Sequence, residues 1–218
     1  MLTLEHPIIR EIDAINWSDI IITHSESYEN YRYVNAEEIA AHLKDLFSGD
    51  MGLAMKATND LWGSLCPQHS YLSSVALTAY DFLMAGLKEF DDKLKVELLD
   101  IFYGFAICTC EEKEIDPQKL REWRELDAQS KANMEKLFPN ATISFDNFSF
   151  LPSDEYLDQL KEKYASKKEF LDWEIAIRKK LMNDIQLFKE LSLSDNESIS
   201  YFAGQVVACL STEGDRSL

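Results

Sequence analysis

Three consecutive stretches of the chain repeat apolar residues at every third or fourth position. They cover about residues 53–65, 74–90 and 92–105, and only short links join them. This spacing places apolar side chains on one face of an α-helix, and that face must be buried against another helix. Glycine and proline, which interrupt helices, number only 7 and 5 in 218 residues. The sequence therefore predicts an all-α protein built from packed helices.

Helix signals continue on both sides of this region. Pro7 suits a first helical position, and Asn35 with Glu38 forms a capping box ahead of an apolar stretch. Short links make neighbouring helices antiparallel. We expect about ten helices in a single helical-repeat domain that spans residues 1–218. Further helices are predicted from 117 to about 137, from 153, around 173–188 and from 194 to about 210.

A local resemblance to a known family adds to this pattern. Residues 53–106 contain a helix that ends in Leu-Trp, a glutamine just beyond, a small-residue helix that ends in Phe-Leu, and a helix with a Leu-Leu pair. The segment resembles bacterial HEAT-like helical-repeat proteins. The resemblance implies antiparallel helix pairs stacked as a degenerate α-solenoid, a scaffold that offers surfaces to other macromolecules. The residues that carry it are Leu61, Trp62, Gln68, Ser74, Phe82, Leu83, Leu98 and Leu99.

The junction after the first of these helices departs from the family pattern at two positions. His69 stands where glycine is common, and Pro67 stands where a polar residue is common. Pro67 is expected to end the helix, because the residue before a proline disfavours helical backbone. We expect Trp62 to seal the seam between neighbouring helices as a core side chain. Gln68 is suited to satisfy backbone groups in the turn.

Charge is strongly negative and unevenly distributed. The net charge is -17, and residues 1–117 hold 21 acidic and 8 basic side chains, against 18 and 14 in residues 118–218. Such a chain repels phosphate backbones and anionic membrane surfaces and associates faster with a basic partner. Solubility alone would also account for the charge. The charge therefore favours a protein partner with a basic surface and disfavours binding to a nucleic acid or a membrane.

The beginning of the chain and its cysteines indicate a compartment. The first residues carry acids instead of the basic start of a signal peptide, and no apolar run reaches the ~18 residues of a membrane span. The four cysteines are too few for the disulfide framework of a small secreted domain. We therefore expect a cytoplasmic protein with reduced, mostly buried thiols.

One segment combines tyrosines with acids ahead of a capped helix, between residues 24 and 38. Tyrosine offers a large, rigid contact area, and acidic side chains steer a cationic partner to a surface. The alternative is that the tyrosines pack onto the first helices. The predicted partner-binding residues are Glu26, Tyr28, Glu29, Tyr31, Tyr33 and Glu37.

A metal site is the remaining candidate for chemistry. A C-x-x-H pair and a downstream C-x-C pair fall at helix ends that antiparallel stacking would place on one side of the molecule: Cys66, His69, Cys108 and Cys110. The spacing is unlike that of common zinc sites, so buried core thiols are the favoured interpretation. No Ser/His/Asp or Cys/His arrangement and no phosphate loop is recognisable. The sequence therefore predicts no metal, no cofactor and no catalytic residue.

These observations lead to a hypothesis of binding. The leading one is a bacterial immunity (antitoxin) protein that neutralises a cognate toxin by direct binding, since acidic inhibitors of basic toxins gain fast capture from charge complementarity. One alternative is a generic HEAT-like adaptor in a larger assembly. The other is a helical-repeat enzyme that acts on nucleic acid, as DNA glycosylases do, which the acidic charge disfavours.

Overall fold

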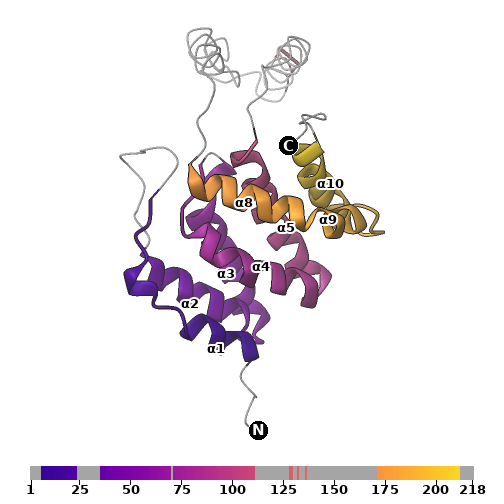
Figure 1. The fold of residues 1–218 in the computed structure, drawn as a ribbon. Helices are drawn as coiled ribbons and strands as arrows, with labels where there is room; N and C mark the ends of the chain where they lie inside the picture. The colour runs from indigo at the N-terminus through magenta and orange to yellow at the C-terminus, as the bar shows by residue number, and fades with distance from the viewer. Residues whose placement is uncertain are drawn as a thin grey trace. The chain divides into compact units, whose positions relative to one another are not determined.

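A computed structural model of the chain describes residues 6–23, 35–69, 71–110 and 171–211, with isolated helical residues at 128, 129, 132 and 136 (Figure 1). In these residues it contains α-helices and short 3-10 helices and no strand, which confirms the all-α prediction for this part of the chain. Eight α-helices are described, where about ten helices were predicted for the whole chain. The elements are α1 (Pro7–Asp13), η1 (Trp17–Asp19), α2 (Ala36–Leu46), α3 (Met51–Leu65), η2 (Pro67–His69), α4 (Ala76–Glu89), α5 (Asp92–Cys108), α8 (Asp172–Asn183), α9 (Ile185–Leu191) and α10 (Glu197–Ser211).

Contacts along the backbone divide the chain into two compact units. The first unit joins Met1–Cys110 with Phe170–Leu218, and the second is Glu111–Glu169. All the helices named above belong to the first unit. A single domain over residues 1–218 stays a prediction.

The longest of these helices, α5, has 17 residues. A helix needs about 20 predominantly apolar residues to cross a bilayer. Within the described ranges, no helix has both the length and the composition to do so.

Side chains cap the starts of several helices, with α2, α3 and α5 among them. The Asn35 side chain accepts a hydrogen bond from the backbone N–H of Glu38 at 2.8 Å, which starts α2 as the capping box predicts. Asp50 and Asp91 accept equivalent bonds at 3.0 and 3.2 Å at the starts of α3 and α5. Each cap satisfies a backbone N–H that the first helical turn leaves without a partner.

The start of α4 has a different origin. Ser73 and Ser74 are of a residue type that commonly caps helices and stand just before α4, but no side chain caps this helix. The Ser74 hydroxyl instead accepts from the Thr23 backbone N–H at 3.0 Å and donates to the Ile21 carbonyl at 3.3 Å. This serine therefore attaches the segment after η1 to the start of α4.

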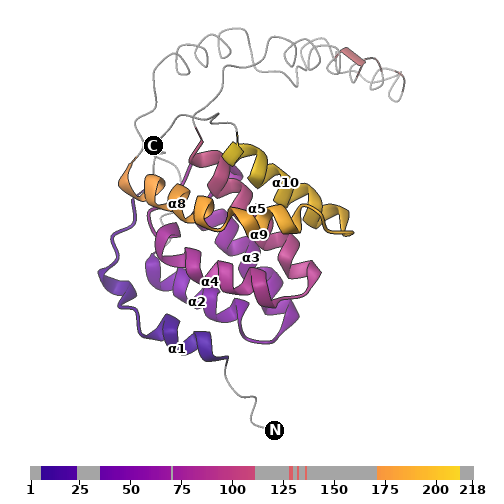
Figure 2. The same cartoon turned by 45° about the vertical axis from the view of Figure 1, so that its right-hand side comes forward.

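Helix α5 lies at the centre of the unit. It packs against α3, η2, α4, α8 and α10 (Figures 1 and 2). A helix with neighbours on several sides must be apolar around most of its circumference, and the second half of α5 meets this need. Its buried residues there are Leu98, Leu99, Ile101, Phe102, Gly104, Phe105, Ala106 and Cys108.

An aromatic cluster joins α5 to α4, which precedes it in the sequence, and to α9, which lies far later. The ring of Phe102 meets those of Tyr80, Phe105 and Phe188 edge-on, with centroids 5.4 to 5.8 Å apart. Edge-to-face pairs add stabilisation beyond the area that they bury. All four rings are fully buried, so the cluster forms the middle of the core.

Helices α5 and α10 run in the same direction. The side chains of Asp92 and Asn196 meet at one end, and the Cys110 thiol meets the Cys209 carbonyl beyond the other end of α5. In a solenoid each repeat contacts only its neighbours along the chain. Here α8 and α10 also contact α4 or α5, which lie far earlier in the sequence. The stacked antiparallel pairs of a HEAT-like solenoid therefore stay a prediction.

Candidate functional site

The predicted partner-binding segment lies mostly outside the described residues. Glu37 is described, and it is exposed in the first turn of α2, where an acidic side chain interacts favourably with the helix dipole. A role for this segment in binding stays a prediction. The five residues that are not described are Glu26, Tyr28, Glu29, Tyr31 and Tyr33.

The four residues considered for zinc are not arranged as one metal site in the described part of the chain. The thiol of Cys66 is buried between α3 and α5 and donates to the Ile101 carbonyl at 3.7 Å. The thiol of Cys110 donates instead to the carbonyl of Cys209 on α10, at 2.9 Å. Among the residues that the structure describes, no three His, Cys, Asp or Glu side chains are arranged to hold a metal ion. The residues concerned are Cys66, His69, Cys108 and Cys110.

Burial also makes Cys66 a poor nucleophile. Its pKa lies well above the ordinary value of a thiol, chiefly because burial disfavours the thiolate. The thiolate is the reactive form of cysteine. The side chain of Cys66 therefore acts as a small core residue, as expected from the sequence.

The backbone of His69 has an unusual conformation for a residue with a side chain. Its φ is 53°, in the left-handed region. Glycine adopts this region without steric cost, whereas another residue pays about 1 kcal/mol or more. The turn is closed by the His69 backbone N–H, which donates to the Cys66 carbonyl at 3.0 Å. Contacts of the imidazole must compensate for this conformation.

Two groups compete for one nitrogen of that imidazole. The indole N–H of Trp62 donates to Nε2 of His69 at 3.2 Å, and Oδ1 of Asp100 lies 3.3 Å from the same Nε2. A nitrogen without a proton can accept from the indole, and a nitrogen with a proton can donate to the carboxylate. The position of the proton on His69 therefore decides which neighbour it holds. The ring also packs edge-on against Tyr103, with centroids 5.1 Å apart.

The close approach of η2 to α5 depends on Gly104. A Cβ at this position would lie 2.7 Å from both the Cys66 sulfur and Cδ2 of His69. Atoms that are not bonded pack best at about 3.5–4.0 Å. A glycine in α5 therefore lets the turn with His69 rest directly on that helix. Nothing local in the sequence distinguishes Gly104 from other helical glycines, so its role could not be predicted.

Helices α3 and α5 leave an open pocket beside this contact. Its volume is about 210 Å³. Trp62 was expected in the core, but it is half-buried and its side chain forms part of the pocket wall. The pocket is lined by Thr58, Asn59, Trp62, Glu97 and Asp100.

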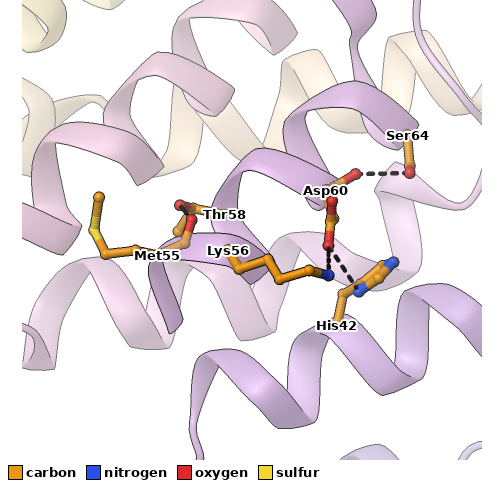
Figure 3. Close-up of polar contacts among 6 residues, drawn as sticks. All are labelled: His42, Met55, Lys56, Thr58, Asp60 and Ser64. Carbon is orange, nitrogen blue, oxygen red and sulfur yellow. Dashed lines mark hydrogen bonds and ion pairs between the residues drawn. The ribbon is translucent and has the colours of Figure 1, made fainter. Parts of the chain in front are cut away.

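The polar groups of the pocket are acidic or neutral, and two of the lining side chains have no polar partner among the described residues. Glu97 and Asn59 form no hydrogen bond or ion pair with any residue in the described ranges, and Asp100 meets only His69. No lysine or arginine lines the pocket. Thr58 is buried, and its hydroxyl donates to the Met55 carbonyl at 2.8 Å (Figure 3). The open groups thus form a negatively charged recess.

Asp60 on α3 differs from the pocket acids on α5, because its carboxylate already has basic neighbours. Asp60 accepts a hydrogen bond from Nζ of Lys56 at 2.7 Å and lies 3.7 Å from Nδ1 of His42 on α2 (Figure 3). Its hydrogen bond raises the pKa of Lys56. The backbone carbonyl of Asp60 accepts from the Ser64 hydroxyl at 2.7 Å. Neighbouring groups therefore already occupy Asp60, in contrast to Glu97.

Local spacing places the pocket residues in pairs, but the sequence alone does not bring the pairs together. Asn59 and Trp62 are three residues apart on α3, and Glu97 and Asp100 are three apart on α5, so each pair shares a helix face. Asn59 lines the same pocket as Glu97, and Cys66, seven residues later, lies against Gly104, seven residues after Glu97. The two helices therefore run in the same direction. This register between α3 and α5 creates the pocket.

Comparison with models of protein families, with curated proteins and with solved structures returned no match. The likeness of residues 53–106 to HEAT-like proteins stays a local resemblance. Because one fold serves many functions, the function is inferred from the chemistry of the site.

Proposed function

We propose that this chain is a protein-binding module for a basic protein partner and, more specifically, an immunity protein that neutralises a cognate bacterial toxin. The observation that carries the proposal is the open acidic pocket between α3 and α5, where Glu97 has no partner among the described residues. A carboxylate without a counter-charge at the rim of a recess favours a cationic group from outside.

The charge of the whole chain supports the same direction. A net charge of -17 attracts a basic protein from a distance and speeds encounter, while it repels nucleic acids. The described pocket offers no activated nucleophile, because the nearby thiol of Cys66 is buried and its pKa is raised. Binding without catalysis therefore accounts for the features of the site.

Three finer expectations belong to this proposal. The helices form a degenerate HEAT-like scaffold, the protein acts in the cytoplasm, and the tyrosine-rich segment at residues 24–38 contributes to the interface. Because immunity by direct binding requires all contacts to come from the chain itself, these expectations can be tested on the complex with the toxin.

The first experiment identifies the neighbouring genes and co-expresses the chain with a toxin domain that they encode. We expect growth to be restored and the two purified proteins to form a stable complex whose association rate falls steeply with ionic strength. A toxin that still kills in the presence of the folded chain, or a pair that does not bind in a purified mixture, would contradict the proposal.

A charge-reversed variant tests the expected contribution of the tyrosine-rich segment. Glu26→Lys together with Glu29→Lys should slow association with the basic partner and leave the melting temperature unchanged, because charges that steer a partner act mainly on encounter. The matched control reverses two acids elsewhere, Glu190→Lys with Asp195→Lys. Equal association rates for the two variants would show that the segment takes no part.

A further inference from the structure

The pocket between α3 and α5 has a size that restricts its ligand. Sites for drug-sized molecules and cofactors occupy about 300–1,000 Å³, and a water molecule takes about 30 Å³ of liquid. A volume of about 210 Å³ is smaller than such a site and still too large for a single ion or water. It suits one side chain inserted from another molecule.

The chemistry of the walls further restricts that side chain. Glu97 and Asp100 on α5 are the acidic residues of the lining, and Asn59 on the facing helix α3 is an amide residue with one acceptor oxygen. Trp62 supplies an aromatic wall. A guanidinium carries five N–H donors in a plane, pairs with carboxylates through two bonds at once and packs on aromatic rings. A lysine ammonium is a compact point charge that uses such a wall less well.

From these contacts we infer that the pocket binds the guanidinium of an arginine side chain presented by the protein partner. The inference rests on the proposed function, since the partner supplies the arginine. A free guanidino compound would bind weakly, because solvent in an open site screens its ion pairs and the compound makes no further contacts around the pocket. A surrounding protein interface supplies the remaining contacts.

The test uses the full chain and a minimal probe, N-acetyl-arginine amide, with N-acetyl-citrulline amide as the neutral isostere. The readout is the NMR signal of the Trp62 indole N–H, which is assigned by its loss in Trp62→Phe. We expect a saturable shift with a dissociation constant on the order of millimolar for the arginine probe and none for the citrulline probe. A response that is equal for both probes, or absent for arginine, would overturn the inference.

Variants of the two carboxylates supply the second arm. Glu97→Gln with Asp100→Asn should weaken binding of the arginine probe by about tenfold or more, since two ion pairs are lost. The control is Glu11→Gln with Asp195→Asn, which removes the same charge at exposed positions on α1 and before α10. Glu97→Gln alone serves if the double variant does not fold, because Glu97 has no partner within the described residues. Equal affinity of the pocket and control variants would refute the assignment.

Two further results separate this inference from the proposed function. A tight toxin complex that is unaffected by the carboxylate variants would reject the arginine pocket and keep the immunity function. Binding of the arginine probe at Trp62 without any toxin complex would do the reverse. An equal response to N-acetyl-lysine amide would reject the guanidinium in favour of a general cation site.

Discussion

Replacing Gly104 with alanine tests the packing of the His69 turn on α5. The new methyl group would lie 2.7 Å from the Cys66 sulfur and from Cδ2 of His69, and 3.2 Å from Cβ of Cys66. These separations are up to about 1 Å shorter than a relaxed contact, and overpacking of this kind costs about 1–3 kcal/mol. Alanine recovers about 1 kcal/mol through its higher helix propensity. The free energy of unfolding should therefore fall by up to about 2 kcal/mol.

A matched glycine separates these two contributions. Gly204 lies inside α10, and a Cβ there would meet no atom within 4 Å. Gly204→Ala should therefore stabilise the protein by about 0.5–1 kcal/mol through propensity alone. The predicted difference between the two alanine variants is about 1–3 kcal/mol, measured by urea unfolding followed by circular dichroism. Equal stability of the two variants would refute the close approach.

The contact with the sulfur can be isolated by a double-mutant cycle. Cys66→Ala removes the sulfur atom that the new methyl group would strike. In the Gly104→Ala background this change should cost less than in the original chain, with a coupling of about 0.5 kcal/mol or more. Additive effects within about 0.3 kcal/mol would place the strain on His69 instead.

Three further perturbations test the described side chains. Burial raises the pKa of Tyr80, and Asp184 has a smaller effect in the same direction. The stability that Tyr80 contributes is therefore present below about pH 10 and is lost at higher pH, because the unfolded chain then ionises first. Tyr80→Phe should flatten this loss, as urea unfolding between about pH 7 and 11 would measure. His69→Gly should be more stable than His69→Ala by about 1 kcal/mol, because only alanine keeps the left-handed strain, and the reverse order would contradict the strain. In the folded protein iodoacetamide should modify the half-buried Cys110 well before Cys66, as mass spectrometry would measure, and equal rates would show that Cys66 is accessible.

Local features of the fold could be predicted because local chemistry determines them. Asn35 begins α2 through a bond to a backbone group three residues away, and Pro67 follows the end of α3, both as expected. Ser74 shows the limit of such reasoning. Its neighbours in sequence suggest a helix cap, but a segment about fifty residues earlier uses its hydroxyl.

The pocket could not be predicted, because it depends on how two helices are aligned. Apolar spacing identifies the face that a helix buries but not which helix covers it or at what height. The left-handed turn at His69 and the missing side chain at Gly104 set that height for α3 and α5. The surroundings of the cysteines depend on packing in the same way, since the thiols of Cys66 and Cys110 bond to the carbonyls of different helices.

The position of α5 at the centre of the unit has a consequence for synthesis of the chain. Its partners α8 and α10 are encoded after a second compact unit, so the last of them is complete only at Ser211, about a hundred residues after α5 ends. At about 5–20 residues per second the ribosome needs about 5–20 s to cover that distance. During this interval the apolar side of α5 that α10 covers stays open to water and to other chains. Nascent chains of this protein are therefore most vulnerable to aggregation, and most in need of a chaperone, between the release of α5 and the release of α10.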